Sequence, residues 1–280
     1  MPRKKAPVEI SEWKPAPFDV AGETVFAIGD THGCTPELTA LLETIRNTQS
    51  DGSRRRLVFI GDLIDRGPDS LGTLALWTEA ERLARVDRVD SLMGNHEQLM
   101  LLAISGGPHA KRVAPMWLEE GGNTVLAEMR AKVGNPKAPL SADLVAATLG
   151  EKTTDLLSTL RSHVRVGNTL FVHGGIDPKA DQDEYLARPW MGLKSASWAW
   201  AREGFIDWAG GFGGTMVVHG HTPPHKHRPI SGMQDPVQFH QDRLCIDAGS
   251  DRSGFVAAAQ IEKDRHRIFR AGKLLPNALI

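Results

Sequence analysis

Side chains that could bind a metal ion or a phosphate recur along this 280-residue chain, each set directly after a short apolar run. The apolar runs are VFAI, LVFI, VDSLM, LFV, MVV and LCI. The polar side chains that follow them are Asp30 and His32; Asp62, Asp65 and Arg66; Asn95 and His96; His173; His219 and His221; and Asp247. Carboxylate, imidazole and amide donors without a thiolate cluster suit Mn, Fe or Zn better than a cysteine-rich structural zinc site. There are more donors than one tetrahedral ion needs, which favours two ions that share a carboxylate.

Taken singly, each of these residues has an ordinary explanation. An aspartate at the end of a strand is most often a turn residue, and a histidine there is most often a hydrogen-bonding residue. Their repetition at six corresponding places indicates a common site. In open α/β sheets, functional groups gather beyond the carboxyl ends of the strands.

The elements that must position these residues alternate between strands and helices. Short runs rich in Val, Ile and Phe are typical of buried strands. Helical periodicity follows two of them, over residues 36–46 and 70–85. This alternation predicts an α/β architecture.

The remaining segments predict one domain with a helical insertion. Helical patterns over 97–104, 115–132 and 141–161 form an excursion, about residues 97–163, that we expect to lie over the strand ends. Residues 178–213 are irregular and rich in Trp. We expect residues 1–20 to be a tail and residues 21–275 to be a single domain.

Composition narrows the classes of partner. The formal net charge is −1, which makes nucleic acid an unlikely partner. The two cysteines, Cys34 and Cys245, lie far apart in the sequence, which argues against a disulfide framework and fits the cytoplasm. No apolar run is long enough to span a membrane, so we expect no membrane partner.

The motifs GDTHG, GDLIDRG, GNHE, HGG and GHT, in this order, are similar to those of the calcineurin-like metallophosphoesterases. The DRG and HE segments resemble the bacterial phosphoprotein phosphatase branch of that superfamily. The resemblance implies two mixed β-sheets in a sandwich flanked by helices, a four-layer αββα fold. It also implies two divalent metal ions as cofactors, with Mn favoured and Fe or Zn as alternatives.

The resemblance also implies roles for individual residues. Asp30 and His32 would bind the first ion, Asp62 would bridge both ions, and Asn95, His173 and His221 would complete the second. His96 would be the general acid, with Asp65 orienting its imidazole and raising its pKa. Arg66 would bind phosphate oxygens. A second phosphate-binding arginine is expected at Arg202, in WAWAREGF, with Arg188 as the competing candidate.

The segment VVHGHTPP leaves two histidines in competition. His219 occupies the place in its apolar run that His173 occupies in its own, so position favours His219. The resemblance favours His221, because the ligand in the family follows the glycine. His219 would then support the ligands or face the substrate.

The resemblance favours a phosphomonoester hydrolase acting on phosphoserine or phosphothreonine in proteins. A hydroxide that bridges the two ions would attack phosphorus in line with the leaving group. The alternative is a pyrophosphohydrolase acting on dinucleoside polyphosphates or RNA caps. Asp65 argues against the symmetrical dinucleoside tetraphosphate hydrolases, which commonly carry Asn there. A non-catalytic scaffold is a third possibility, against which the intact ligand set and His96 count.

Overall fold

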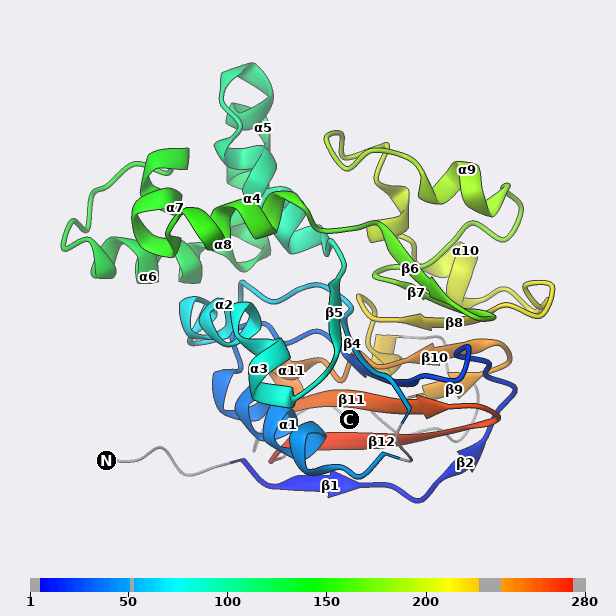
Figure 1. Ribbon diagram of the computed structural model, residues 1–280. Coiled ribbons are helices and arrows are strands. Elements are labelled where there is room, and N and C mark those ends of the chain that lie inside the picture. The colour runs from blue at the N-terminus through cyan, green and yellow to red at the C-terminus, as the bar shows by residue number, and fades with distance from the viewer. Residues whose placement is uncertain (1–5, 51–52, 227–237, 274–280) are drawn as a thin grey trace.

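The computed structural model describes residues 6–50, 53–226 and 238–273, which form two β-sheets with helices around them (Figure 1). The first sheet has seven strands, with the order β1-β12-β11-β3-β4-β5 and β2 paired to β12. Strands β3, β4 and β5, at one end of this order, are parallel, and the other pairs are antiparallel. The strands are β1 (Val8–Ile10), β2 (Lys14–Pro15), β3 (Thr24–Ile28), β4 (Arg55–Phe59), β5 (Arg88–Ser91), β11 (Phe255–Glu262) and β12 (Arg265–Gly272).

The second sheet has five strands in the order β6-β7-β8-β10-β9. Strands β7, β8 and β10 are parallel, and β6 and β9 pair antiparallel at the two edges. The strands are β6 (His163–Val166), β7 (Thr169–Val172), β8 (Met216–His219), β9 (Gln238–His240) and β10 (Arg243–Cys245). All six apolar runs of the sequence are therefore strands, and they form one parallel triplet in each sheet. Parallel strands end on the same side, so the polar motifs that follow them can meet.

Alternation along the strands explains how the two sheets pack. In β3, Val25 and Ala27 lie in the core between the sheets, where they join Phe171 of β7. The intervening Phe26 and Ile28 belong to a second core that contains the apolar face of the first helix. Successive side chains of a strand point to opposite faces, so a fully apolar strand is covered on both sides. The expected α/β sandwich of two mixed sheets is confirmed.

Helices cover the outer faces of the sandwich. On the seven-stranded sheet they are α1 (Thr35–Asn47), α2 (Ser70–Thr78) and α3 (Ala80–Ala84). The helical pattern predicted over 70–85 is interrupted at Glu79, whose φ of −109° and ψ of 6° are not helical. The Trp-rich segment contains the short helices α9 (Gln182–Leu186), η2 (Ser197–Ala199) and α10 (Glu203–Ile206), and η3 (Pro224–Lys226) and α11 (Ser250–Ser253) follow strands of the sandwich.

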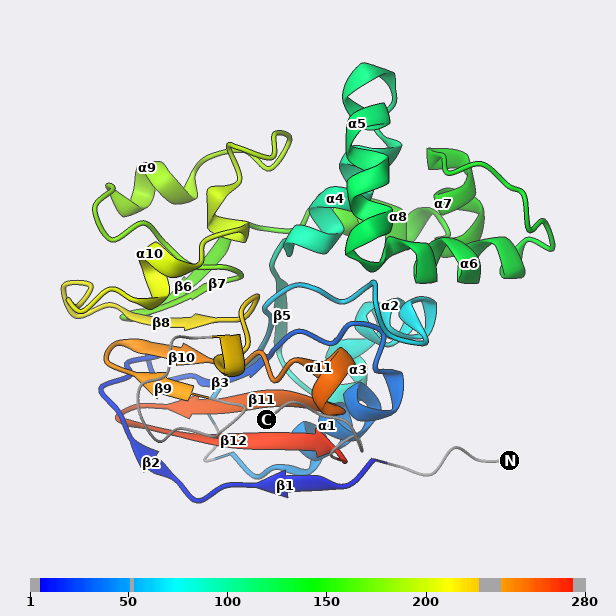
Figure 2. The same cartoon turned by 180° about the vertical axis from the view of Figure 1, so that it is seen from behind.

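The predicted helical excursion is confirmed and stands above the strand ends (Figures 1 and 2). Its elements are α4 (Asn95–Ile104), α5 (Gly107–Trp117), the π-helix η1 (Leu118–Gly122), α6 (Asn123–Lys132), α7 (Ala142–Leu149) and α8 (Glu151–Ser158). At the break between α5 and α6, Gly121 has a φ of 114°. A Cβ atom there would lie 2.6 Å from Cγ of Arg66. This glycine lets the insertion approach the loop after β4.

The segment expected to be a tail differs from that expectation from residue 8 onward, while residues 1–5 lie outside the described part. Val8–Ile10 pairs with Phe269–Ala271 of β12. Phe18 and Val20 are 1% and 0% exposed. Without this segment β12 would be an open sheet edge, which proteins generally cover. The backbone of Ser11 donates to the carbonyl of Ile268, a contact between opposite ends of the chain that short-range patterns cannot reveal.

A buried histidine of β12 makes the stability of the protein depend on pH. His266 of β12 is 2% exposed and stacks on Phe239, with ring centroids 5.4 Å apart. Burial lowers its pKa to about 4. Between pH 6.5 and about pH 4, His266 is therefore protonated in the unfolded chain but not in the folded chain. Because the unfolded state binds more protons, the free energy of unfolding falls as the pH falls through this window.

We expect His266→Phe, which preserves an aromatic stack, to remove that part of the acid sensitivity. Relative to the wild type, the variant should gain on the order of 2 kcal/mol between pH 6.5 and pH 4, measured by urea unfolding. Parallel stability curves for the two proteins over this range would contradict the assignment. His109→Phe, on α5 of the insertion, serves as a histidine control.

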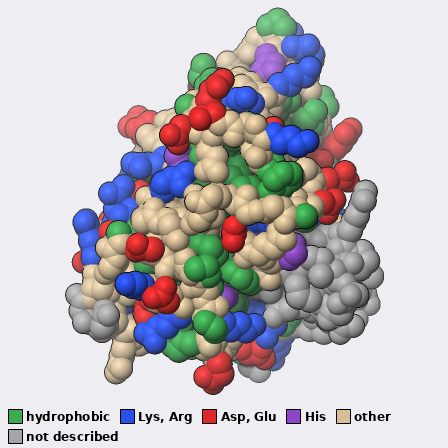
Figure 3. Space-filling view, turned by 90° about the vertical axis from the view of Figure 1, so that its right-hand side faces the viewer, with side chains coloured by type: hydrophobic (Ala, Val, Ile, Leu, Met, Phe, Trp, Pro, Cys, Tyr) green, Lys and Arg blue, Asp and Glu red, His purple; other side chains and the backbone are tan. Residues whose placement is uncertain are grey.

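The surface of the described part carries charges of both signs. On the face shown in Figure 3, acidic and basic side chains are interspersed, and neither covers the face. Among the described residues, no helix is both long enough and apolar enough to cross a membrane.

Candidate active site

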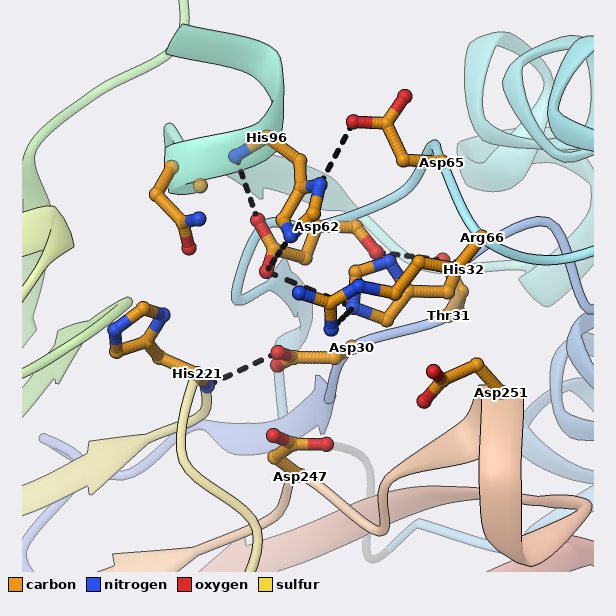
Figure 4. A network of polar contacts seen from close by, with 12 residues as sticks. Asp30, Thr31, His32, Asp62, Asp65, Arg66, His96, His221, Asp247 and Asp251 are labelled. Atoms are coloured by element: carbon orange, nitrogen blue, oxygen red, sulfur yellow. Dashed lines mark hydrogen bonds and ion pairs between the residues drawn. The ribbon is translucent and has the colours of Figure 1, made fainter. Parts of the chain in front are cut away.

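The loops after the parallel strands of both sheets bring the predicted residues to one place. Figure 4 shows Asp30, His32, Asp62, His96 and His221 around a common centre, with Asp247 close below. All of them are buried, with exposures of 6% or less. Asn95 and His173 are equally buried and join this group, because Nε2 of His173 lies 3.0 Å from Oδ1 of Asn95 and 3.3 Å from Oδ2 of Asp62.

Asp62 lies at the centre of the group. Its Oδ2 is 3.7 Å from Nε2 of His32, 3.8 Å from Nε2 of His96 and 3.3 Å from Nε2 of His173. The donor atoms form two sets, and within each set all atoms lie within 4.8 Å of one another. One set comes from His32, Asp62 and His96, and the other comes from Asp62, His173 and His221. Asp62 belongs to both sets, as a carboxylate that bridges two ions must.

Backbone carbonyls orient two of the imidazoles. Nδ1 of His32 lies 2.8 Å from the carbonyl oxygen of Ile64, and Nδ1 of His173 lies 3.0 Å from that of Ile60. A carbonyl can only accept, so each Nδ1 carries a proton, which leaves Nε2 of the neutral ring available as a ligand. This arrangement is typical of histidines that bind metal ions.

The unpaired atoms of the site also fit metal ions. Asp30 Oδ1, His96 Nε2 and His221 Nε2 are buried and have no hydrogen-bond partner. Burial, followed by the charges of Asp247 and Asp62, raises the pKa of Asp30 well above its usual value. Burial opposes ionisation of Asp62 too, but His173 and His96 lower its pKa well below the usual value. A cation among these groups would relieve the crowding of carboxylates and occupy the free lone pairs.

The donor sets differ in one respect from the expected ligands. His96 stands beside His32 and Asp62, where the resemblance placed Asp30. One oxygen of Asp30 instead accepts a hydrogen bond from the backbone N–H of His221, at 3.0 Å, while the other is unpaired. Gly220 permits this approach, since a Cβ atom there would lie 2.0 Å from Asp30 Oδ1. His96 is thus placed both as a ligand and as an acid, and the two roles need separate tests.

His96 and Asp65 form a buried pair that the insertion completes. Nδ1 of His96 lies 2.7 Å from Oδ2 of Asp65, and Nε1 of Trp117 donates to both Asp65 oxygens at 2.9 and 3.1 Å. Burial, together with Glu97 and Asp62, raises the pKa of Asp65 well above its usual value.

The expectation that Asp65 raises the pKa of His96 is wrong. Burial lowers the pKa of His96 well below its usual value, and the opposing charge of Asp62 does not compensate. A carboxyl group that is itself held toward its neutral form cannot act as a full charge partner. The proton is therefore best assigned to the His96–Asp65 pair as a unit.

Glu97 supports the site, although it was not among the residues predicted from the sequence motifs. Its carboxylate accepts from the backbone N–H groups of Asp62, Leu63 and Gly94, at 2.9, 2.7 and 3.1 Å. It thereby fixes the loop that carries Asp62 to the start of α4. The signal was present in the sequence, because Glu97 is the third helical residue after Gly94, the position of a capping-box glutamate.

The site loops hold several residues in the left-handed region of the backbone. Nine non-glycine residues of the described part have positive φ, and five of them belong to the site. They are His32 (41°), Asp62 (51°), Asp65 (73°), Arg66 (63°) and His221 (67°). Each such conformation costs roughly 1–2 kcal/mol for a residue with a Cβ atom. The surrounding packing and Glu97 must hold these loops in place.

A cavity of about 350 Å³ opens beside the metal-binding group and contains two of the three predicted arginines. Arg66 reaches Nε2 of His32 at 3.2 Å and lies 3.4 Å from the Glu120 carboxylate. Arg202 lines the same cavity. Arg188 does not line it; its guanidinium donates to Ser197 and lies over the ring of Tyr185, 5.1 Å from the centroid.

The geometry separates the two histidines of VVHGHTPP. The ring of His221 lies against that of His173, with centroids 5.2 Å apart. The ring of His219 packs against Phe205, with centroids 4.9 Å apart, and its Nδ1 lies 3.1 Å from the carbonyl of Gly220. His219 thus belongs to the wall behind the site.

We expect His221→Ala to lose one of two metal equivalents and His219→Ala to retain both, because only His221 joins a donor set. Inductively coupled plasma mass spectrometry of the dialysed proteins measures the difference. Loss of an ion from the His219 variant alone would show that the wrong histidine was chosen.

The tryptophans of residues 190–208 belong mainly to the core. Trp198 is 1% exposed, and Trp190, Trp200 and Trp208 pack against the same cluster. Nε1 of Trp200 donates to Gln98 of α4 at 2.7 Å. These contacts join the Trp-rich segment to the insertion.

Comparison with known proteins agrees with this geometry. The model of the calcineurin-like phosphoesterase family matches residues 23–225. Serine/threonine-protein phosphatase 1 of Salmonella typhimurium is 40% identical over 99 residues, which are 35% of this chain and 39% of the relative. The asymmetrical bis(5'-nucleosyl)-tetraphosphatase of Bacillus subtilis is 28% identical over 216 residues, 73% of this chain and 81% of the relative.

Structural similarity extends over most of the chain. A crystal structure described as that of a proposed diadenosine tetraphosphatase matches 90% of this chain and 95% of its own, with a TM-score of 0.51 and 22% identity. At that identity the likeness shows the fold. The first three curated relatives are matched over only 39%, 45% and 27% of their own length.

Proposed function

This chain belongs to the calcineurin-like phosphoesterase family, and from that premise we propose that it is a phosphomonoester hydrolase that acts on phosphoserine and phosphothreonine side chains of proteins. The observation that carries the proposal is the His96–Asp65 pair, whose unpaired Nε2 faces Asp62 beside a cavity that two arginines line. Such a pair can protonate a leaving alkoxide, the most difficult part of hydrolysing an alkyl phosphate.

The roles of the residues follow from their placement. Asp30, His32, Asp62, Asn95, His173 and His221 would hold two divalent cations, of which we favour manganese. Bound there, these cations supply Lewis acidity and an activated water at neutral pH. Arg66 and Arg202 hold the phosphate oxygens, and Arg66 offers a planar fork that suits bidentate contact. His96 donates the proton of the His96–Asp65 pair to the departing oxygen, while Trp117 holds Asp65 in position.

The lining of the cavity favours a phosphorylated side chain over a dinucleotide. Among the described residues, no Phe, Tyr or Trp lines the cavity beside the metal-binding group. A nucleobase bound within this cavity would lack the aromatic surface on which bases commonly stack. Tyr185, Phe205 and Trp208 line a separate cavity of about 470 Å³, which shares Arg202 with it. A phosphoserine or phosphothreonine needs only the phosphate contacts and space for a peptide.

A dinucleoside polyphosphate hydrolase is the second candidate. Its support is the length of the match to the Bacillus subtilis relative, which spans far more of this chain than does the Salmonella phosphatase. Both candidates use the same metal-dependent attack on phosphorus. We place the protein in the cytoplasm for either function, since both cysteines are free and buried.

Turnover of three substrates in the presence of Mn²⁺ tests the proposal. We expect hydrolysis of a phosphothreonine peptide and of an aryl phosphate, and a kcat/KM for diadenosine tetraphosphate at least about tenfold below that for the peptide. A preference for diadenosine tetraphosphate by orders of magnitude would overturn the choice. Absence of turnover with Mn²⁺, Fe²⁺ or Zn²⁺ would favour the scaffold.

A further inference from the structure

A second and larger cavity, of about 800 Å³, adjoins the metal-binding cavity. Arg66 and Asp251 line both cavities, so the two meet at the phosphate-binding arginine. The walls come from the start of α1, from α6, from α11 and from the segment that precedes β1. Figure 2 shows α11 on the side of the molecule where α1 and β11 also lie. The volume lies within the range of about 300–1,000 Å³ typical of ligand sites.

The walls of this second cavity are apolar and acidic. Ala6, Pro7, Pro36, Pro68 and Cys34 supply the apolar surface. The acidic groups are Glu37, Glu128 and Asp251, and the cations are Arg66 at the junction and Lys273 at the other end. A nucleotide extending from the metal-binding site would bring further negative charge to these carboxylates.

The three carboxylates differ in their hydrogen bonds and ion pairs. Glu128 accepts from the backbone N–H groups of Ser70 and Leu71, at 3.0 and 2.9 Å, and so serves the start of α2. Asp251 lies 3.8 Å from Nε of Arg252. Among the described residues, no cation lies within ion-pairing distance of Glu37. Burial raises the pKa of Glu37, as expected for a carboxylate that lacks a cationic partner.

Ser250 lies in the same wall but belongs to its packing. It is 2% exposed, and its Oγ is buried beside the Cys34 thiol, with which it interacts. Glu37, which has no ion pair among the described residues, is therefore the polar group that this wall offers to a ligand.

We propose that the second cavity binds the chain that flanks the phosphorylated residue of a protein substrate, and that Glu37 selects substrates with a lysine or arginine in that flank. The proposal rests on the proposed phosphatase function and adds a substrate class to it. A basic side chain has an apolar stem and a charged end, which matches a wall of prolines with a carboxylate that has no ion pair among the described residues.

The test compares phosphothreonine peptides that differ only in their flanks. One peptide has alanine on both sides, two carry paired arginines at two to five residues before or after the phosphothreonine, and one carries glutamates there. We expect the better of the two arginine peptides to exceed the alanine peptide in kcat/KM by roughly three- to tenfold, mainly through KM. The glutamate peptide should fall below the alanine peptide, and added salt should reduce both differences.

Two variants assign the preference to Glu37. Glu37→Gln should bring the arginine and alanine peptides to within about twofold of each other, and Glu37→Lys should reverse the order toward glutamate. Glu81→Gln, which makes the same change of charge on the exposed face of α3, should preserve the wild-type preference. Unchanged turnover of an aryl phosphate, too small to reach the second cavity, shows that each variant is folded and active.

The outcomes separate this inference from the proposed function. Equal hydrolysis of all four peptides by the wild type would overturn the inference and leave the phosphatase function intact. An arginine preference that persists in Glu37→Gln would overturn the role of Glu37. Turnover of the aryl phosphate and diadenosine tetraphosphate, with no turnover of any peptide, would overturn the proposed function itself.

Discussion

His96→Ala is expected to lower kcat for a phosphothreonine peptide by about 10²–10⁴-fold while both metal ions remain bound. The alkoxide of threonine is a poor leaving group and needs a proton as the P–O bond breaks. In the wild type that proton comes from the His96–Asp65 pair, whose atoms lie 2.7 Å apart. An aryl phosphate leaves as a stabilised phenolate, so its turnover should fall far less. Kinetics on both substrates, with the metal content of the same preparation, measure the effect.

The metal content of this variant also decides between the two roles of His96. Its Nε2 belongs to a set of donors with His32 and Asp62, so it could bind an ion instead of carrying a proton. Loss of one metal equivalent, with equal losses of activity on both substrates, would show that His96 is a ligand. His109→Ala, which removes a histidine of the insertion, should retain metal and activity.

Asp62→Asn is expected to lose both ions and to reduce kcat/KM for every substrate by at least about 10³-fold, since the ions contribute several kcal/mol of transition-state stabilisation. Asp62 is the residue shared by the two sets of donors. The amide keeps the size of the carboxylate, and its oxygen can still accept from the backbone N–H of His96. Loss of metal would therefore report lost charge and not lost fold. Metal analysis and the melting temperature of the metal-free protein measure the two effects.

A matched control and a clear contradiction accompany this prediction. Asp155→Asn makes the same chemical change on the exposed surface of α8 and should retain both ions. The metal-free Asp62→Asn protein should still unfold cooperatively but melt below the metal-free wild type, because His173 and His96 hold the pKa of Asp62 well below its usual value and so stabilise its charge in the folded state. If Asp62→Asn retained two metal equivalents, the bridging role would be refuted.

The sequence predicts the parallel triplets and misses the elements that depend on distant pairing. Runs such as VFAI and LVFI are apolar on both faces, so they could only be buried strands. In β11, Ala257, Ala258 and Ala259 have a weak intrinsic preference for strands, and β12 contains three arginines. Their conformation depends on pairing with β3 and β1, more than 200 residues away.

The same distinction applies to the site. The candidate ligands are readable because each follows a strand directly and the strands are parallel. The role of Trp117 cannot be read from the sequence, because this residue lies in a helix of the insertion, 52 residues from Asp65. Nothing in the sequence around Trp117 distinguishes it from a core residue. The direction in which the pKa of His96 shifts could not be predicted either, since it depends on how completely the site is buried and on the raised pKa of Asp65.

The left-handed residues of the site have a consequence for how this enzyme could be improved. Five positions in the catalytic loops carry side chains on a backbone that glycine would adopt without strain. Selection for heat resistance alone would therefore favour glycine at Arg66, where the side chain is partly exposed, and relief of strain there would remove a group needed for turnover. A thermostable variant with full activity has to find its gains elsewhere, in the core between the sheets or along the edge that residues 8–20 cover. Screens for such variants should score turnover alongside melting temperature from the first round.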